Sequence, residues 1–330
     1  MITAPDLSRG GTRGGRWATA ACWLAAAPVA AWALVRLAGL ESGPLVLAIA
    51  FTPYVAALAP VVAVSALALR RRAPAVVAAL AALSLIGAVA PRAVPDARPP
   101  ADGPTLRLLT ANLRLGSADP AGLVDLARVR RVDVLTVQEL TPALAAELDR
   151  LGLATLLPYR SLSPEVGSTG SGVYARHPLR DTGHRRNQGF FFTQAYATVT
   201  VPGAPPLRVE SAHPAAPYAV DVVPDWWTDQ RAQPPATPDD GLSVLAGDFN
   251  ATLDHAALRE LIATGYTDAA DAAGAGFGGT WGPYDGDPIP PVTIDHVLVD
   301  RRIAVRAAGT FPVPGSDHRA LLAELRLPAG

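Results

Sequence analysis

The chain contains no lysine, one cysteine and one methionine. All 28 basic residues are therefore arginine, which codon usage explains more simply than function, so no arginine is significant merely for its type. The single cysteine, Cys22, excludes an intrachain disulfide framework and a cysteine-based zinc site. It leaves an extracytoplasmic location open, because a domain of more than about 200 residues can be stable on its core alone.

Charge is distributed unevenly along the 330 residues, a length that favours two structural units. Residues 1–100 carry nine arginines and three acidic residues, whereas residues 101–330 carry 19 arginines and 26 acidic residues. A basic head and an acidic body indicate different surroundings. The acidic body weakens a nucleic-acid hypothesis, since phosphate neutralisation drives such binding. It does not exclude one, because a bound metal ion changes the local field.

Three apolar segments occupy the first third of the chain. Residues 17–35 run 19 positions without a charge, residues 44–69 run 26, and the Ala-rich residues 74–90 run 17. A membrane span needs roughly 20 apolar residues, and about 17 at the short end. Pro53 and Pro60 would break a soluble helix, but membrane helices tolerate proline. We therefore predict three transmembrane helices, of which the third segment is the weakest.

Two alternatives for these segments are a signal peptide and a soluble helical bundle. A cleaved signal would not be followed at once by a second, longer uncharged run. A soluble bundle would show charged residues at helical spacing, and these segments show none. The pattern therefore favours a membrane anchor.

Arginines that flank the segments predict the orientation in the membrane. Three lie within residues 9–16, before the first segment, and three are residues 70–72, between the second and the third. Between the first and the second there is only Arg36, opposed by Glu41. Positive charge marks the cytoplasmic side. Three spans then place the body outside the cytoplasm, whereas loss of the third span would leave it inside.

The predicted organisation has four parts. Residues 1–16 form a cytoplasmic N-terminus and residues 17–90 a membrane region with about three transmembrane helices. Residues 91–104 contain five prolines and indicate a stiff, extended linker. Residues 105–327 form the body domain.

Short apolar runs alternate with turn-rich segments in the body, a pattern typical of strands. The first two runs, 106–111 and 132–137, bracket a helix that begins at Asp119-Pro120, an N-cap followed by proline. A second helix is expected to begin at Asp254. Many strands with few helices indicate two packed sheets flanked by helices. The other strand candidates are 172–175, 195–201, 207–212, 243–246, 293–299 and 320–325.

Acid, amide and imidazole side chains recur near the ends of these runs, where a rigid scaffold presents them to a cleft. Hard oxygen ligands without cysteine favour Mg²⁺ or Mn²⁺, which leave room for substrate phosphate. A carboxylate can activate water, and a histidine oriented by an aspartate can stabilise a phosphoryl oxygen. The residues concerned are Asn112, Glu139, His213, Asp248, Asn250, Asp295, His296, Asp317 and His318.

The motifs TANLR, VQEL, SGVYARHPL, AHP, GDFN, TIDHVL and SDH occur in the order typical of one superfamily. Over residues 105–327 the chain resembles the endonuclease/exonuclease/phosphatase superfamily, which includes deoxyribonuclease I-like nucleases, sphingomyelinases and inositol-polyphosphate 5-phosphatases. The resemblance implies an α/β (α+β) fold, a four-layer αββα sandwich of the deoxyribonuclease I-like type, here preceded by a helical transmembrane region.

The resemblance also implies a role for each matching residue. Glu139 would be the main metal ligand, with Asn112 and Asp317 close to the same Mg²⁺ or Mn²⁺ ion. Asp248 would activate the water and Asn250 would hold Asp248 or the phosphate. His318, oriented by Asp295, would contact the scissile phosphate, and His213 would be the second imidazole. Arg114 and Tyr174 would line the substrate site.

Structural interpretations compete with several of these roles. Arg114 is as readily a surface arginine, and Tyr174 is more readily a packing residue. His296 should point to the opposite sheet face from Asp295 and is interpreted as structural. Trp226 and Trp227 fit a core position slightly better than an aromatic rim facing lipid. The remaining histidines have no motif context and are expected to be solvated: His177, His184 and His255.

These features favour a membrane-anchored, divalent-metal-dependent phosphohydrolase that acts outside the cytoplasm on a phosphate ester, for which membrane tethering favours a lipid-linked substrate. The loop 274–291, with Asp285 and Asp287 and no basic residue, is poorly suited to a DNA backbone. The alternatives are a surface nuclease acting on DNA or RNA and a catalytically silent, membrane-tethered binding module. No protein partner is inferred. The architecture also resembles actinobacterial membrane proteins of this superfamily linked to glycopeptide resistance.

Overall fold

The computed structural model describes residues 13–237, 241–283 and 288–330. Residues 1–12, which hold Arg9 and most of the predicted cytoplasmic segment, lie outside the described residues, as do Asp285 and Asp287 of the Gly/Pro-rich loop. The chain divides into two compact units. The helical unit contains the described residues up to Glu41 together with Phe51–Ala90, and the body contains Ser42–Ala50 together with Pro91–Gly330.

The helical unit consists of α1 (Arg13–Ala38), α3 (Thr52–Ala68) and α4 (Arg72–Val89). Its helices meet through small side chains, including Ala33, Ala56 and Ala81. The outward side chains are large and apolar: Leu24 is 77% exposed and Leu83 is 68% exposed. Two helices, Gly14–Ala38 and Arg72–Ala93, are long and apolar enough to cross a membrane, whereas Thr52–Ala68 is apolar but shorter.

The second apolar segment does not form the single long helix that its 26 uncharged residues suggested. It divides into α2 (Pro44–Ile49) and α3, and α3 has Pro53 in its first turn. The break has a physical cause: proline lacks an N–H and disfavours helical conformation in the residue before it, so it starts a helix more readily than it continues one. The third segment, predicted to be the weakest, forms one of the two helices of spanning length.

The body is built on two six-stranded sheets, ordered β11-β12-β1-β2-β4-β3 and β5-β6-β7-β8-β10-β9. The first sheet contains β1 (Thr105–Asn112), β2 (Val134–Gln138), β3 (Tyr159–Ser163), β4 (Ser171–Ala175), β11 (Ala304–Pro312) and β12 (Arg319–Arg326). The second contains β5 (Leu179–Arg186), β6 (Thr193–Val199), β7 (Leu207–Ala212), β8 (Leu242–Asp248), β9 (Tyr266–Asp268) and β10 (Asp295–Asp300).

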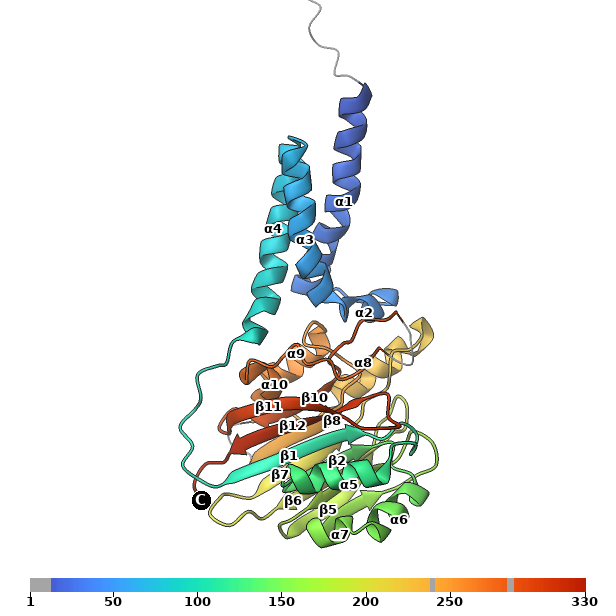
Figure 1. Cartoon of the computed structure of the whole chain (residues 1–330), viewed down its shortest axis with the longest axis vertical. Helices are drawn as coiled ribbons and strands as arrows, with labels where there is room; N and C mark the ends of the chain where they lie inside the picture. Colours follow the sequence, from blue (N-terminus) through green and yellow to red (C-terminus); the bar gives the residue numbers. More distant parts are fainter. Residues whose placement is uncertain (1–12, 238–240, 284–287) are drawn as a thin grey trace, which may run out of the picture. The chain divides into compact units, whose positions relative to one another are not determined.

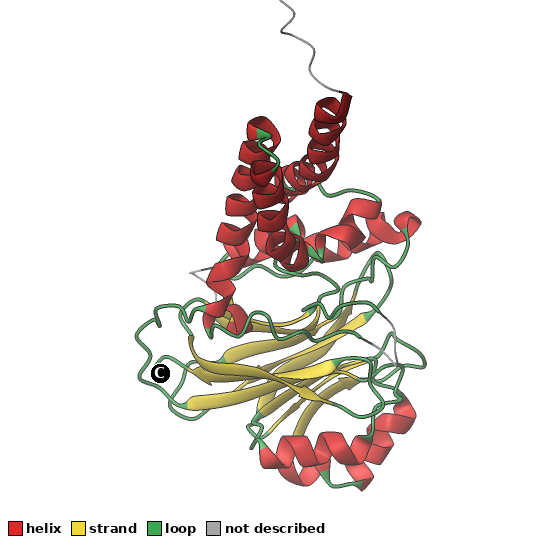
Figure 2. Cartoon of the chain, turned by 45° about the horizontal axis from the view of Figure 1, so that its top comes forward, coloured by secondary structure: helices red, strands yellow, loops and turns green. Residues whose placement is uncertain are grey.

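Helices cover the outer faces of both sheets, with α5 to α7 on one side and α8 to α10 on the other (Figures 1 and 2). The predicted four-layer αββα sandwich is confirmed. The helices are α5 (Pro120–Val129), α6 (Pro142–Arg150), α7 (Leu153–Leu156), α8 (Val223–Arg231), α9 (Ala256–Ala263) and α10 (Ala269–Ala272), with 3-10 turns η1 (Ala90–Ala93) and η2 (Val220–Val222).

Side-chain alternation on the strands builds the layered core. On β1, Leu106 and Leu108 enter the cluster between the sheets, whereas Leu109 and Ala111 pack in the cluster beneath α5 to α7. A strand covered on both faces is apolar at nearly every position, which explains the continuous runs in the sequence. Asp119 caps α5 as predicted, because its carboxylate accepts hydrogen bonds from the N–H groups of Ala121 and Gly122.

The beginning of the predicted linker belongs to the body. Arg92 is buried and forms a bidentate ion pair with Asp254, at 2.9 and 2.7 Å. Asp254 therefore does not start α9, which begins at Ala256 after the N-cap residue His255. The buried pair fixes residues 91–93 to the second sheet's helical layer, so the extended segment starts later than expected.

His255 is buried, contrary to the prediction that it is solvated. Its Nδ1 accepts a hydrogen bond of 2.8 Å from the N–H of Thr252, so the ring proton lies on Nε2 when the imidazole is neutral. Nε2 then donates to the carbonyl of Val46 in α2, at 2.8 Å. This histidine therefore fastens α2 to the body, a long-range role that no local motif indicates.

His296 is structural, as its strand parity predicted. It is fully buried, with Nδ1 2.7 Å from a carboxylate oxygen of Asp268 and Nε2 2.9 Å from the carbonyl oxygen of Ala251. Burial alone would lower its pKa, but the charge and hydrogen bond of Asp268 outweigh burial, and the pKa of His296 lies above its usual range.

We expect His296→Gln to destabilise the body by about 3–5 kcal/mol near pH 6, because it leaves Asp268 buried without its cationic partner. A histidine with a raised native pKa stabilises fully below its unfolded pKa of about 6.5, and the stabilisation is lost as pH rises through the native value. The difference between wild type and variant should therefore shrink at alkaline pH. Denaturant midpoints between pH 5.5 and 9 measure it, with the exposed His184→Gln as control; a constant difference would contradict the charged pair.

Candidate active site

Two parallel strand pairs end at one edge of the sandwich. In the first sheet β1 and β2 are parallel, with Asn112 opposite Gln138, and in the second β7 and β8 are parallel, with Ala212 opposite Gly247. Carboxyl ends of parallel strands meet at a common edge, so side chains at or just beyond these positions converge. The structure brings together seven of the predicted site residues, joined by contacts described below: Asn112, Glu139, His213, Asp248, Asn250, Asp295 and His318.

Asn112 links the two sheets at this edge. Its Nδ2 donates to Glu139 Oε1 at 3.1 Å and to Asp248 Oδ2 at 3.0 Å. The other oxygen of Glu139 accepts from the N–H of Leu115 at 2.6 Å. Burial raises the pKa of Glu139, and these two hydrogen bonds partly oppose the increase. Glu139 also has a left-handed backbone, with φ of 58°, a conformation that costs free energy and is concentrated at functional sites.

Asp248 lies at the centre of the cluster. Its Oδ2 is 3.9 Å from His213 Nε2 and 3.7 Å from His318 Nε2, and its Oδ1 accepts from the N–H of Asn250 at 2.8 Å. Burial raises the pKa of Asp248 to about 7, although the positive charge of His318 acts in the opposite direction. A Cβ at Gly247 would lie 1.9 Å from the carbonyl oxygen of Ala212, so glycine is required immediately before Asp248.

His318 forms a dyad with Asp295. The Nδ1 of His318 lies 2.8 Å from Asp295 Oδ2, and Asp295 sits directly opposite Asp248 in the register of β10 and β8. Burial would lower the pKa of His318, but the carboxylates of Asp295 and Asp248 outweigh it and raise the pKa to about 10. The imidazole is therefore a cation at neutral pH, with Nε2 directed toward Asp248.

His213 is the electrostatic opposite of His318. It is buried, and its ring stacks on Phe192 with centroids 4.3 Å apart. Burial, reinforced by the charge of His318, lowers the pKa of His213 to about 3. Its buried Nδ1 has no hydrogen-bond partner among the described residues. The cluster thus holds one neutral and one charged imidazole on either side of Asp248.

Helix α8 supports the loops that carry these groups. The indole N–H of Trp226 donates to the carbonyl of Asn250 at 3.0 Å, and Gln230 donates to the carbonyl of Phe249. The buried carboxylate of Asp229 accepts from the N–H of Ala215, just after His213, at 3.1 Å. Trp226 is fully buried, as the core interpretation predicted, and α8 positions the GDFN and AHP loops from behind.

One group of acidic and imidazole side chains in the described residues is close enough to consider for a cation. Asp248, Asp295 and His318 have ligand atoms within 4.8 Å of one another. We reject this group as the main site, since an imidazolium hydrogen-bonded to Asp295 offers no lone pair to a metal ion. The half-buried carboxylate of Glu139 lies in the field of Asp317, which raises the pKa of Glu139 further, and a divalent cation beside it would relieve both effects.

Arg114 and Asp317 lie at the rim of the cluster. Arg114 Nε is 3.9 Å from Asp317 Oδ2, and both side chains remain partly exposed. They line a pocket of about 170 Å³ together with His318 and Arg319. Two guanidinium groups beside His318 suit a phosphate group.

Sequence reasoning missed two residues of this rim. Arg319 follows His318 directly in the SDHR motif and lines the pocket. Ser316 donates to the carbonyl of Asn112 at 2.8 Å and accepts from the N–H of His318 at 3.0 Å. The available signal was that Ser316 is the first residue of the SDH motif and Arg319 follows it, but only the fold shows that Ser316 connects the end of β1 to His318.

Tyr174 does not reach the cluster, contrary to its assignment as a substrate-binding residue. It is fully buried in the cluster beneath α5 to α7, whereas its neighbours Val173 and Ala175 face the space between the sheets. Strand alternation is the physical reason, because successive side chains point to opposite faces. The packing interpretation of Tyr174 therefore holds.

We expect Tyr174→Phe to leave activity unchanged and to raise the unfolding free energy by up to about 1 kcal/mol. The buried hydroxyl has no hydrogen-bond partner among the described residues, and an unpaired buried hydroxyl is costly. Steady-state rates and denaturant midpoints of the full chain measure both quantities. A tenfold loss of activity with an unchanged midpoint would instead place Tyr174 in substrate binding.

Comparison with known proteins agrees with this geometry. Residues 109–318 match the model of the Endonuclease/Exonuclease/phosphatase family. No curated protein matches the sequence. Similar solved structures include an endonuclease/exonuclease/phosphatase from Beutenbergia cavernae DSM 12333, with 21% identity, a TM-score of 0.54 and coverage of 68% of this chain and 72% of that one.

Two further neighbours share the fold. Humanized D. rerio TDP2 has 16% identity and a TM-score of 0.55, covering 67% of this chain and 98% of that one. The 3' phosphatase NExo from Neisseria has 18% identity and a TM-score of 0.52, covering 66% and 98%. With the family match over residues 109–318, the chain belongs to the endonuclease/exonuclease/phosphatase family, whose members are metal-dependent hydrolases of phosphoric ester bonds.

Proposed function

We propose that the protein is a membrane-anchored, Mg²⁺-dependent phosphohydrolase that acts outside the cytoplasm on a lipid-linked phosphate ester. The main support for a hydrolytic site is that His213 Nε2 and His318 Nε2 lie 3.9 and 3.7 Å from Asp248 Oδ2. Asn112 connects Glu139 to the same carboxylate by hydrogen bonds to both residues. Charged and neutral imidazoles around one carboxylate suit attack of water on a phosphorus atom.

Glu139 would hold the ion, with Asn112 and Asp317 beside it. An all-oxygen donor set with no cysteine favours Mg²⁺, and Mn²⁺ is the alternative. When bound, the ion would neutralise charge on the phosphate oxygens and orient the ester. The chain's own contribution is to keep Glu139 half-buried and fixed by the Leu115 N–H, at 2.6 Å.

Asp248 would accept the proton of the attacking water. Its pKa of about 7 suits a general base near neutral pH. Asn250 fixes the carboxylate by donating its N–H to Oδ1 at 2.8 Å, which leaves Oδ2 facing the two imidazoles. Asn250 in turn is held by its side-chain N–H to the carbonyl of Pro214, at 3.1 Å.

His318 would bind a nonbridging phosphate oxygen and stabilise the charge that develops there. Its pKa of about 10, maintained by Asp295 and Asp248, keeps it cationic. His213, neutral at physiological pH because burial lowers its pKa to about 3, would donate a hydrogen bond to the same phosphate through Nε2. Arg114 and Arg319 at the rim would bind a second phosphate of a pyrophosphate.

The helical unit supports membrane anchoring. Two of its helices have spanning length, and large apolar side chains cover its outer surface, as in Leu24 and Leu83. Helix α3 has 17 residues, the short end of the spanning range of about 17–25. Three crossings, with the arginines of residues 70–72 on the cytoplasmic side, would place the body outside the cytoplasm.

An aromatic row beside the cluster supports an apolar group on the substrate. Phe192, stacked on His213, contacts Phe190, whose ring lies 6.1 Å from that of Tyr218. Tyr218 is 65% exposed and Phe191 is 62% exposed. Exposed aromatic side chains that lead to a catalytic histidine suit a lipid chain attached to the phosphate.

A surface nuclease is the second candidate, favoured by two neighbours whose structures contain DNA: D. rerio TDP2 complexed with single strand DNA product and Neisseria NExo bound to a product DNA hairpin. Their identities of 17% and 18% support the fold only. The excess of acidic residues in positions 101–330 opposes binding to a polyanion.

The full-length chain in detergent micelles should be assayed with Mg²⁺ against four substrates: a polyprenyl pyrophosphate, sphingomyelin, bis(p-nitrophenyl) phosphate and plasmid DNA. We expect the lipid-linked substrates to be hydrolysed fastest and plasmid DNA slowest. Faster plasmid nicking, with steep salt dependence, would favour the nuclease. No turnover of any substrate would favour a silent binding module.

A separate measurement tests the orientation. We expect protease added to intact cells to remove a tag fused after Gly330, because three crossings export the body. A tag that is cleaved only after cell lysis would place the body in the cytoplasm and overturn this part of the proposal.

A further inference from the structure

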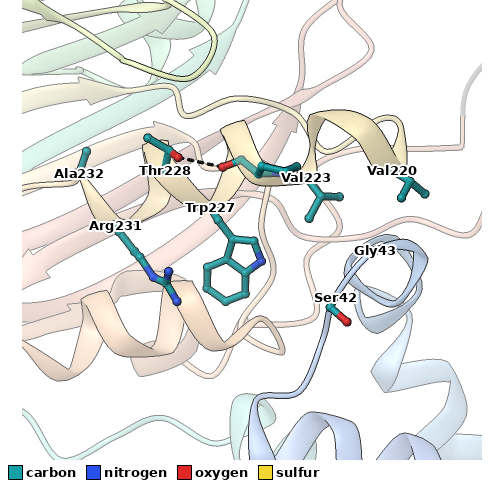
Figure 3. A pocket seen from close by; sticks show the side chains of 9 residues that line it. Ser42, Gly43, Val220, Val223, Trp227, Thr228, Arg231 and Ala232 are labelled. Carbon is teal, nitrogen blue, oxygen red and sulfur yellow. Dashed lines mark hydrogen bonds between the residues drawn. The ribbon is translucent and has the colours of Figure 1, made fainter.

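The body carries a surface pocket of about 800 Å³ whose lining includes none of the residues of the candidate active site. Figure 3 shows Trp227 and Arg231 projecting from α8 toward the side on which Ser42 and Gly43 precede α2. The pocket is therefore formed by the helix that supports the catalytic loops and by the segment between two apolar helices. Its main lining residues are Ser42, Gly43, Val220, Val223, Trp227 and Arg231.

Helix α2 is apolar along its length. Val46 and Ile49 are buried, and Val46 belongs to the core beneath α8 and α9. Leu45 and Leu47, also apolar, are 40% and 38% exposed. A short helix that buries some of its apolar side chains in the body and exposes others favours an apolar environment outside.

Chain connectivity identifies that environment if the helical unit is in a bilayer. Gly43 is the fifth residue after Ala38, the last residue of α1. Thr52, the first residue of α3, is the third residue after Ile49. An extended chain spans at most about 3.6 Å per residue. Both ends of α2 thus lie within about 20 Å of a spanning helix.

Arg231 and Trp227 supply the chemistry of a lipid headgroup site. The guanidinium carbon of Arg231 is 4.5 Å from the ring centroid of Trp227, and Arg231 makes no ion pair with any residue that the structure describes. Tryptophan is enriched at the membrane interface, and arginine binds phosphate with two parallel hydrogen bonds. Val220 and Val223 add an apolar wall suited to the first methylene groups of an acyl chain.

We infer that this pocket binds an anionic phospholipid of the surrounding bilayer, with Arg231 on the headgroup phosphate and Trp227 against the glycerol region. The inference rests on the membrane anchoring proposed above. Its consequence for catalysis follows from α8: Trp226, adjacent to Trp227, donates to the carbonyl of Asn250 at 3.0 Å. A lipid held on the outer face of α8 would therefore restrain the helix that supports the GDFN loop.

The test uses the full-length chain with Arg231→Gln and, as matched control, Arg180→Gln, another exposed arginine without an ion pair in the described part of the chain. Native mass spectrometry in detergent measures retained phosphatidylglycerol against retained phosphatidylcholine. We expect wild type and Arg180→Gln to retain phosphatidylglycerol preferentially and Arg231→Gln to retain at least about tenfold less, since the variant loses the charge-assisted hydrogen bonds to the headgroup phosphate. Equal retention by all three would overturn the inference.

A kinetic measurement separates this inference from the proposed function. Arg231→Gln should hydrolyse soluble bis(p-nitrophenyl) phosphate at the wild-type rate, which also shows that it folds. Its KM for a substrate embedded in phosphatidylglycerol vesicles should rise about tenfold, with kcat unchanged. An unchanged KM contradicts the pocket's role alone, whereas loss of the wild-type chain from membranes on carbonate extraction contradicts the anchoring on which it rests.

Discussion

Glu139→Gln is expected to lower kcat/KM by about 10³-fold or more at fixed Mg²⁺, which corresponds to roughly 4 kcal/mol of transition-state stabilisation. The substitution keeps the shape of the side chain but removes the charge that would hold the cation. Metal affinity should fall at least about 10–100-fold, the loss typical when even an outer partner of a ligand is removed. Initial rates over a range of Mg²⁺, together with Mn²⁺ titration calorimetry, measure the two effects.

A stability measurement distinguishes this role from a structural one. Burial raises the pKa of Glu139, so its ionised form is disfavoured in the fold and the neutral variant should unfold at the same or a higher denaturant concentration. Glu147→Gln, an exposed residue of α6 paired with Arg150, is the matched control and should keep wild-type activity. Loss of stability together with activity in Glu139→Gln would point to misfolding rather than to a lost metal ligand.

Asp295→Asn is expected to lower kcat by about 10³-fold, because an amide cannot hold the charge of His318 as the carboxylate does at 2.8 Å. The same change should lower the pKa of His318, since Asp295 is the largest contributor to the increase that brings it to about 10. The alkaline limb of the pH–rate profile should therefore move to lower pH in the variant. Rates between pH 6 and 10.5 measure the shift.

The dyad predicts non-additive effects. Once His318→Gln has removed the imidazole, Asp295→Asn should cost little further activity, because the two residues act as a unit. Asp300→Asn, at the other end of β10 and paired with Arg302, is the control and should remain active. Fully additive losses, or an unchanged alkaline limb in Asp295→Asn, would mean that Asp295 acts independently of His318.

Much of the body's fold could be predicted from the sequence because its strands are buried on both faces. Such strands appear as short apolar runs, as at 207–212, which matches β7 residue for residue. Strand β5 was missed, since only three of the eight residues of Leu179–Arg186 are partly buried and the segment contains three arginines. Helix α2 was missed because its apolar sequence continues that of α3, and only long-range contacts, the bond from His255 to Val46 and the packing of Val46 in the core, assign it to the body.

The site could be predicted where a motif carries the chemistry and not where a side chain's direction matters. Asn112 and Asp248 come together because parallel strands end at one edge, and His318 joins them because antiparallel β12 begins beside the end of β1. Tyr174 lies within a matching motif, but strand alternation directs its side chain away from the space between the sheets and into the outer core. The opposite charge states of His213 and His318 depend on burial and on Asp295, which only the three-dimensional arrangement supplies.

The most direct test of the account is the rate of phosphodiester hydrolysis by the full-length chain before and after removal of divalent cations. The account predicts that EDTA abolishes hydrolysis, that Mg²⁺ restores it, and that Glu139→Gln and His318→Gln remain inactive under both conditions. Hydrolysis that persists in EDTA, or that survives either substitution, would contradict a metal-dependent site built on Glu139 and the Asp295–His318 dyad.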